Sequence, residues 1–213
     1  MNPRHCSDEH ISHRRLSLLQ LFAACAVLVF AAGNAVAQPP SFGNGKGITF
    51  DMVPSGACLS GAKGHVRVDS KGAVEVMDVD VEGLPPKTNF DFFVIQVPHA
   101  PFGLSWYQGD IETNGDGRGH GHFVGRFNIE TFIVAPGSQP APVVHAADAS
   151  SNPPTAPVHT YHLGLWFNNP ADAVRAGCPG TVTPFNGDHT AGVQVLNTSN
   201  FPDLAGPLRQ LTP

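Results

Sequence analysis

Two histidines on one predicted strand are the residues whose types and spacing most directly allow chemistry. In His120-x-His122 the imidazoles stand two positions apart, and alternate side chains of a β-strand project from the same face. Neighbouring imidazoles are ligands that copper(II) and zinc(II) accept. His120 and His122 are therefore the candidate metal ligands. Gly119 and Gly121 flank them beside a turn, where histidines are commonly only solvated, and that alternative stays open.

A second pair of histidines does not predict a shared face. His159 and His162 have a spacing that suits a helix, but residues 158–167 predict a strand that places them on opposite faces. A comparison with copper-zinc superoxide dismutase also fails, because the strand after the Gly-Leu-x-Pro corner, residues 89–94, contains no histidine.

Two adjacent aromatic residues form the second candidate site. Trp106 and Tyr107 are neighbours on a predicted strand, so we expect one ring to pack inward and the other to be exposed. An exposed ring beside polar groups can stack on a sugar or anchor a protein partner. Trp106 and Tyr107 are therefore the candidate ligand-binding residues. The alternative is that both tryptophans, Trp106 and Trp166, belong to the core.

Signatures of common catalytic centres are missing from the sequence. It has no Gly-x-Ser-x-Gly elbow, no His-Glu-x-x-His motif and no phosphate-binding loop. Residues 112–117 partly match a calcium-binding loop, but Asn-Gly and Asp-Gly turns alone explain them. The carboxylates of Asp110, Glu112 and Glu130 have no feature that separates a glycosidase pair from ordinary surface residues. No catalytic residue and no cofactor are predicted, and whether the chain is an enzyme stays open.

Composition indicates which elements position these residues. The chain has 213 residues, of which 41% are hydrophobic and 14% charged, with 23 glycines and 20 prolines. So many helix breakers disfavour a helical bundle or coiled coil, and the apolar fraction is too high for a disordered chain. A net charge of -5 with only 12 basic residues argues against a nucleic-acid partner. A turn-rich, mainly β protein remains.

The first 37 residues predict a secretion signal. A basic segment ending at Arg15 precedes an uncharged run, 16–32, and Ala35-x-Ala37 supplies the small residues of a cleavage site. An uncleaved anchor helix is the alternative, although the run is at the short limit for crossing a bilayer. We expect a secreted or periplasmic protein with no membrane attachment after cleavage.

Export also decides the expected state of the cysteines. Cys6 and Cys25 lie in the predicted signal, which leaves Cys58 and Cys178 in the mature chain. In an oxidising compartment two such thiols are expected to form one disulfide bond. On the chain-entropy account, closing a loop of about 120 residues stabilises the fold by roughly 4–5 kcal/mol. Metal-ligating or free thiols are the alternative.

Short apolar stretches between turn signals predict an all-β fold. Strands are expected at 48–53, 65–69, 73–82, 90–97, 105–113, 122–134, 158–167 and 191–197. A change of phase near Met77-Asp78 predicts a β-bulge, and the run 90–97 predicts a strand buried on both faces. The turn at 114–119 predicts that the strands on either side of it pair as a hairpin.

One helix and one long loop complete the expected elements. Asn169 is a suitable cap for a helix over 170–176, and Gly177 ends it. Six prolines in residues 135–157 predict a surface loop, and residues 38–47 predict a flexible lead-in.

Two resemblances bear on the fold and the compartment. The segment GLPPKTNF is similar to the strand corner of fibronectin type III and other immunoglobulin-like domains, with Phe90 where those usually carry Tyr. That resemblance implies a single immunoglobulin-like β-sandwich over 48–213, without the hydroxyl bond of the corner. Blocks within 98–202, PFGLSWYQGDIET and YHLGLWFNNPADAVRAGC among them, resemble an uncharacterised family of exported bacterial proteins. This second resemblance implies a secreted domain and no site residues.

The sequence as a whole predicts a secreted, non-catalytic binding or structural module for an extracellular ligand, glycan or protein. One alternative is a copper- or zinc-binding protein or metal-dependent enzyme that uses His120 and His122. The other is a carbohydrate-binding module that uses Trp106 and Tyr107. A third ligand within reach of both imidazoles would favour the metal, and an exposed ring with polar neighbours would favour the sugar.

Overall fold

Strands dominate the part of the chain that the computed structural model describes, which is residues 41–42, 47–127, 131–133, 157–183 and 190–211. The strands are β1 (Ser41–Phe42), β2 (Gly47–Pro54), β3 (Lys63–Ser70), β4 (Glu75–Glu82), β5 (Asn89–Ile95), β6 (Ser105–Glu112), β7 (Gly119–Gly125), β8 (Thr131–Ile133), β9 (Pro157–His159), β10 (His162–Phe167) and β11 (Gln194–Asn197). The helical segments are α1 (Pro170–Arg175) and the 3₁₀ turn η2 (Pro207–Gln210). The prediction of an all-β fold is confirmed.

Several predicted segments differ in extent from the observed ones. The predicted strands 122–134 and 158–167 are each divided in two, and β1 lies inside the predicted lead-in 38–47. The predicted signal, 1–37, and nearly all of the predicted loop 135–157 lie outside the described residues.

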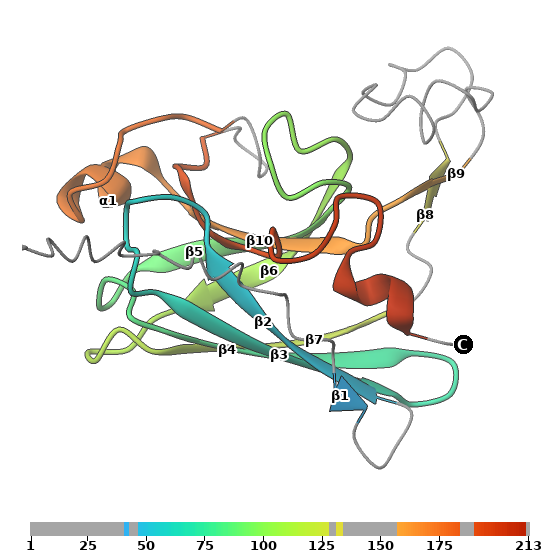
Figure 1. Cartoon of the computed structure of the whole chain (residues 1–213). Helices are drawn as coiled ribbons and strands as arrows, with labels where there is room; N and C mark the ends of the chain where they lie inside the picture. The colour runs from blue at the N-terminus through green and yellow to red at the C-terminus, as the bar shows by residue number, and fades with distance from the viewer. Residues whose placement is uncertain (1–40, 43–46, 128–130, 134–156, 184–189, 212–213) are drawn as a thin grey trace, which may run out of the picture. The chain divides into compact units, whose positions relative to one another are not determined.

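Nine strands of the described segments form one antiparallel sheet in the order β6-β5-β10-β11-β2-β3-β4-β7, with β1 paired to β2 (Figure 1). The junction between β11 and β2 is short and consists of Leu196 opposite Pro54 and Asn197 opposite Val53. A single bridge joins Thr113, which directly follows the end strand β6, to Gly119, the first residue of the other end strand, β7. The sheet is therefore nearly closed on itself, like a barrel.

One hydrophobic core lies between the inward faces of two groups of strands. Strands β2, β3 and β4 contribute alternate side chains such as Phe50, Val66 and Val79. Strands β5 and β10, on the other side of the core in Figure 1, contribute side chains such as Phe92 and Leu165. Burying these side chains together is the main force that holds the two groups against each other.

The outer face of β5 and β10 is covered as well. Phe93, Ile95, Trp166 and Ala191 form a second buried cluster there, and the partly buried Phe102 packs against it. Strand β5 is consequently buried along almost its whole length, which confirms the prediction of a strand buried on both faces.

Strand β4 corrects the prediction of a bulge near Met77-Asp78. Its pairing with β3 and with β7 runs without a change of register. The change of phase has another cause, because Glu75 takes an inward position and Val76 an outward one. The carboxylate of Glu75 accepts a hydrogen bond from the Phe127 N–H at 2.7 Å, which satisfies a buried donor.

The turn after β6 forms as predicted, but the hairpin around it does not. The carbonyl of Asn114 accepts from the Gly117 N–H, and its side-chain oxygen accepts from the N–H groups of Asp116 and Arg118. Strand β6 nevertheless pairs with β5, and β7 pairs with β4. The predicted pairing of β6 with β7 is wrong apart from one bridge, and β7 lies beside β4 instead.

Helix α1 and the disulfide bond agree with the predictions. The Asn169 side chain accepts a hydrogen bond from the Ala171 N–H at 2.7 Å and caps the helix. Cys58 and Cys178 form a disulfide bond with their Cα atoms 5.5 Å apart, so the segment after β2 is joined to the segment after α1. None of the helices described is both long enough and apolar enough to cross a membrane.

Candidate metal site

Strand β7 presents His120 and His122 on its outer face because the intervening positions turn toward the core. Gly121 is one of these positions, and a Cβ atom there would lie 2.6 Å from the ring of Phe123. A larger residue at this position would therefore have to displace that ring. The side chains of His120 and His122 are 55% and 57% exposed, and they share one face as the alternation predicts.

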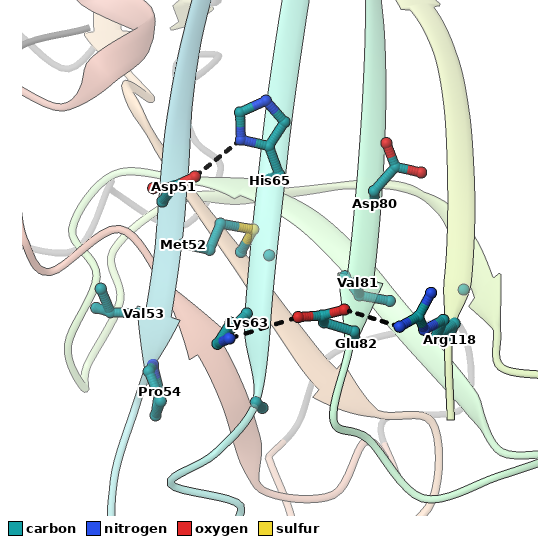
Figure 2. Close-up of a pocket in the computed structure, with 13 residues that line it drawn as sticks. Asp51, Met52, Val53, Pro54, Lys63, His65, Asp80, Val81, Glu82 and Arg118 are labelled. Carbon is teal, nitrogen blue, oxygen red and sulfur yellow. Dashed lines mark hydrogen bonds and ion pairs between the residues drawn. The ribbon is translucent and has the colours of Figure 1, made fainter. Parts of the chain in front are cut away.

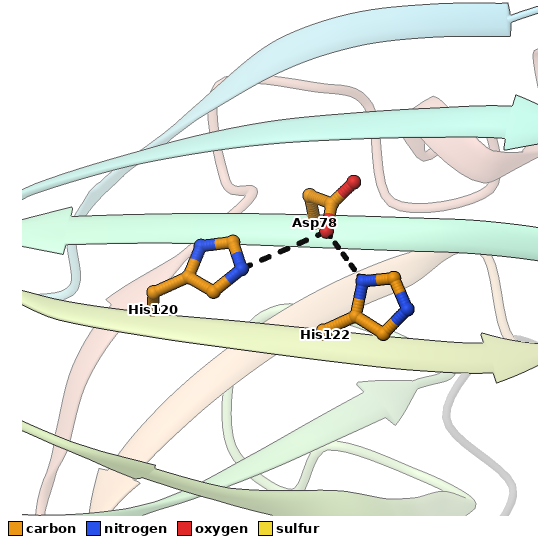
Figure 3. Close-up of side chains that lie close together, drawn as sticks. All are labelled: Asp78, His120 and His122. Carbon is orange, nitrogen blue, oxygen red and sulfur yellow. Dashed lines mark hydrogen bonds and ion pairs between the residues drawn. The ribbon is translucent and has the colours of Figure 1, made fainter.

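Strand β4 brings two carboxylates to the same face. Asp80 lies opposite His120 in the antiparallel ladder, and Asp78 lies opposite His122. Nδ1 of His120 is 2.8 Å from an oxygen of Asp80, and Nδ1 of His122 is 2.7 Å from Oδ1 of Asp78. The same Oδ1 of Asp78 lies 3.7 Å from Nε2 of His120, so it faces both rings (Figure 3).

Asp78, His120 and His122 together have the geometry of a metal site. Among the described residues they are the one group of at least three potential ligands whose coordinating atoms all lie within 4.8 Å of one another. Two ligands on one tetrahedral zinc ion stand about 3.4 Å apart, given bond lengths near 2.1 Å. The distances from Asp78 Oδ1 to His122 Nδ1 and to His120 Nε2, 2.7 and 3.7 Å, lie on either side of that value. Small side-chain rotations would therefore seat an ion and leave one position for water or a ligand.

The polar face continues across β3 and β2. His65 on β3 lies opposite both Asp51 on β2 and Asp80 on β4. Nδ1 of His65 is 2.8 Å from Oδ1 of Asp51, which repeats the geometry of the His120–Asp80 pair. Because His65 and Asp51 stand outside the cluster of three ligands, this second pair offers a natural control for the first.

A cavity of about 600 Å³ adjoins the cluster on this face. Its charged and imidazole-bearing lining residues are Asp51, Lys63, His65, Asp80, Glu82 and Arg118 (Figure 2). Glu82 lies between the two cations, 3.5 Å from Lys63 and 3.6 Å from Arg118. Asp80 belongs to this lining and also binds His120, so the cavity and the cluster share one carboxylate.

The aromatic candidates are both exposed, Trp106 by 54% and Tyr107 by 45%. The prediction that one of them packs inward is wrong, although Ile111 on the same strand is fully buried. The register of β6 with β5 shifts between Phe92 and Phe93, so strict alternation does not hold along β6. Trp166, by contrast, is fully buried.

Tyr107 is held firmly despite its exposure. Its ring meets Phe93 edge to face, and its hydroxyl donates to Asp110 at 2.5 Å. The other oxygen of Asp110 accepts from the Asn89 amide. Partial burial and the hydrogen bond to Asp110 raise the pKa of the Tyr107 hydroxyl, so this phenol stays protonated.

His162, weighed above for its spacing from His159, is a buried structural residue. Its Nδ1 lies 2.8 Å from the Thr198 hydroxyl, and its Nε2 lies 3.2 and 3.0 Å from the carbonyls of Pro202 and Asp203. Burial lowers the pKa of His162, so the neutral ring is favoured. His159 ends β9 and His162 begins β10, so the two histidines belong to different strands.

Sequence reasoning missed the two aspartates of β4. Asp78-x-Asp80 has the same spacing as His120-x-His122, and that match was a usable signal once the two strands were paired. Neither a protein-family model nor a curated protein matches this chain. Its function is therefore inferred from the geometry of the site.

Proposed function

We propose that this protein binds a divalent transition-metal ion, copper(II) or zinc(II), through Asp78, His120 and His122. The observation that carries the proposal is the position of Asp78 Oδ1, which lies 2.7 Å from one imidazole nitrogen and 3.7 Å from the other. Two imidazoles and a carboxylate are ligands that both ions accept. Three protein ligands leave one coordination position for an exchangeable ligand.

The proposal places this site on an exported, immunoglobulin-like β-sandwich that acts as a binding module without a catalytic step. The signal pattern in residues 1–37 and the Cys58–Cys178 disulfide bond support export. The core shared by β2, β3 and β4 with β5 and β10 supports a sandwich. Cys58 and Cys178 are paired with each other, so they offer no thiolate, and the proposed ligands are two imidazoles and a carboxylate.

Metal loading of the purified, oxidised protein tests the proposal. After dialysis against zinc(II) or copper(II), mass spectrometry of the bound metal is expected to give one ion per chain. The double variant His120→Ala, His122→Ala should lose it, whereas His65→Ala should keep it, because His65 pairs with Asp51 outside the cluster. Wild-type protein without stoichiometric metal, or a double variant that retains it, contradicts the proposal.

Carbohydrate binding is a second candidate, favoured by the exposed and rigidly held ring of Tyr107. A sugar could stack on that ring while Asp110 and Asn89 meet its hydroxyl groups. Glycan-array binding is then expected for the wild type and lost in Tyr107→Ala. The control is Val174→Ala, which truncates an exposed apolar side chain on α1. Binding that survives Tyr107→Ala and Trp106→Ala together would exclude this function.

A further inference from the structure

The two imidazoles of the proposed metal site are not equivalent. Nδ1 of His120 lies 2.8 Å from an oxygen of Asp80, while its Nε2 lies 3.7 Å from Oδ1 of Asp78. A carboxylate can only accept a hydrogen bond, so the close contact assigns the proton of the neutral ring to Nδ1. Nε2 of His120 therefore carries a lone pair, and that lone pair faces the metal position.

His122 has the opposite arrangement. Its Nδ1 donates to Asp78 at 2.7 Å, so this nitrogen must give up its proton to Nε2 before it can coordinate an ion. No hydrogen bond from another described residue holds Nε2 of His122, so the exchange of tautomers meets no obstacle there. One ligand is thus set in advance and the other adapts when the ion binds.

The contact between His120 and Asp78 favours a cation over a hydrogen bond. Nε2 of His120 and Oδ1 of Asp78 are both acceptors, and they face each other with no hydrogen between them. A cation placed between two acceptors is attracted by both. The tautomer that Asp80 imposes on His120 therefore places two acceptor atoms opposite each other. This arrangement favours a cation between them, because no hydrogen bond can join two acceptors.

We propose that Asp80 is the positioning residue of this metal site, because its hydrogen bond to His120 Nδ1 fixes the tautomer and the ring orientation that present Nε2 to the ion. The inference rests on the proposed metal function and adds a residue that does not itself touch the metal. Carboxylates that hold a ligating histidine in this way contribute about 10- to 100-fold to metal affinity. We expect an effect of that size from Asp80.

A matched pair of substitutions separates this role from a general effect of removing charge. Asp80→Asn and Asp51→Asn each replace a carboxylate that lies 2.8 Å from a histidine Nδ1 on the same face. The two aspartates are almost equally exposed, at 68% and 69%. An amide can turn its NH₂ group toward the ring and reverse the tautomer, so Asp80→Asn disturbs His120 and Asp51→Asn disturbs only His65.

Competition titrations with zinc(II) and imidazole nitrogen NMR of the metal-free protein are the two readouts. Asp80→Asn is expected to weaken zinc affinity by about 10- to 100-fold and to move the His120 proton from Nδ1 toward Nε2. Asp51→Asn should stay within about twofold of the wild type. Asp80→Glu keeps a carboxylate, which can only accept a hydrogen bond, so it should bind zinc more tightly than Asp80→Asn, whose amide can also donate.

Three results would overturn the inference. Zinc affinity of Asp80→Asn within twofold of a metal-binding wild type would remove Asp80 from the site. Equal losses of zinc affinity in Asp80→Asn and Asp51→Asn would show that the effect arises from the removal of surface charge and not from the orientation of His120. A wild type that binds no zinc(II) or copper(II) would contradict the proposed function itself, and the positioning role would fail with it.

Discussion

The outer faces of the two groups of strands differ in what covers them. On β5 and β10 the outer side chains are buried in the second cluster, which includes Trp166 and Phe93. On β3, β4 and β7 the outer positions carry His65, Asp80, His120 and neighbouring polar side chains, which remain exposed. The covered face contributes stability, and the open face has the ligand atoms needed for a binding site.

The sequences of the strands reflect this difference in burial. An open face leaves alternate positions free for polar residues, as in β3, where Lys63, His65 and Arg67 are exposed and the residues between them are buried. A strand covered on both sides has no such freedom, and FDFFVI in β5 is nearly continuous in apolar residues. Substitutions should therefore change stability on one face and ligand binding on the other.

The largest effect is expected where a side chain leaves the covered face. Trp166→Ala should lower the free energy of unfolding by about 3–5 kcal/mol, because it removes a fully buried ring. Val124→Ala, on the open face of β7, should change it by no more than about 0.5 kcal/mol, since Val124 is 62% exposed. Urea unfolding measures both values. Similar losses in the two variants would contradict the claim that the covered face contributes more to stability than the open face.

Removing the disulfide bond should have the next largest effect. It connects the segment after β2 with the segment after α1, and so joins one group of strands to the other. Replacing Cys58 and Cys178 together by alanine is expected to cost about 2–5 kcal/mol in thermal or urea unfolding. A loss below about 1 kcal/mol would show that the shared core alone holds the two groups together.

His162 is buried, unlike the exposed histidines of β7. Burial lowers the pKa of His162. The unfolded chain then binds a proton at this histidine more readily than the folded chain does. The contribution of neutral His162 to the free energy of unfolding is therefore complete above pH 6.5 and declines as the pH falls below that value. For one proton the slope is at most about 1.4 kcal/mol per pH unit.

Urea unfolding of the wild type and of His162→Gln between pH 8 and pH 5 tests this dependence. The wild type should be more stable than the variant at pH 8, and the difference should shrink on acidification. A difference that stays constant, or grows toward pH 5, would contradict the burial of a neutral ring at this position.

The smallest effect is expected at the cap of α1, the helix that follows β10. Asn169→Ala removes the hydrogen bond to the Ala171 N–H and should cost about 1 kcal/mol of unfolding free energy. Asn169→Asp keeps an acceptor and should remain close to the wild type. Equal losses in the two variants would show that the cost arises from packing and not from the cap.

Local patterns predicted most of the strands, the helix and the disulfide bond, because each of these depends on residues close in sequence or on a single remaining pair of thiols. The turn at 114–119 was predicted correctly for the same reason. The partner of β7 was not, because the turn at 114–119 leads from β6, which pairs with β5, to β7, which pairs with β4, and no local pattern shows this change of neighbours. The prediction of a bulge in β4 was wrong because it assumed that every valine points inward. In β4 the inward position is taken by the buried Glu75, and Val76 points outward.

The candidate site was predicted in part. His-x-His spacing identified His120 and His122, since alternation alone places them on one face. Asp78 and Asp80 come from a strand about 40 residues earlier, and only the register of β4 with β7 brings them to those imidazoles. The hydrogen bonds that distinguish the two rings depend on side-chain orientation, which no sequence pattern encodes.

The most direct test of the central claim is anomalous diffraction from crystals of the oxidised protein grown with zinc(II). The account predicts one zinc peak bound by Oδ1 of Asp78, Nε2 of His120 and Nδ1 of His122, with bond lengths near 2.1 Å. Asp80 should remain hydrogen-bonded to His120 on the side away from the ion. A protein without a peak on the outer face of β4 and β7, or with its zinc held by other residues, would contradict it.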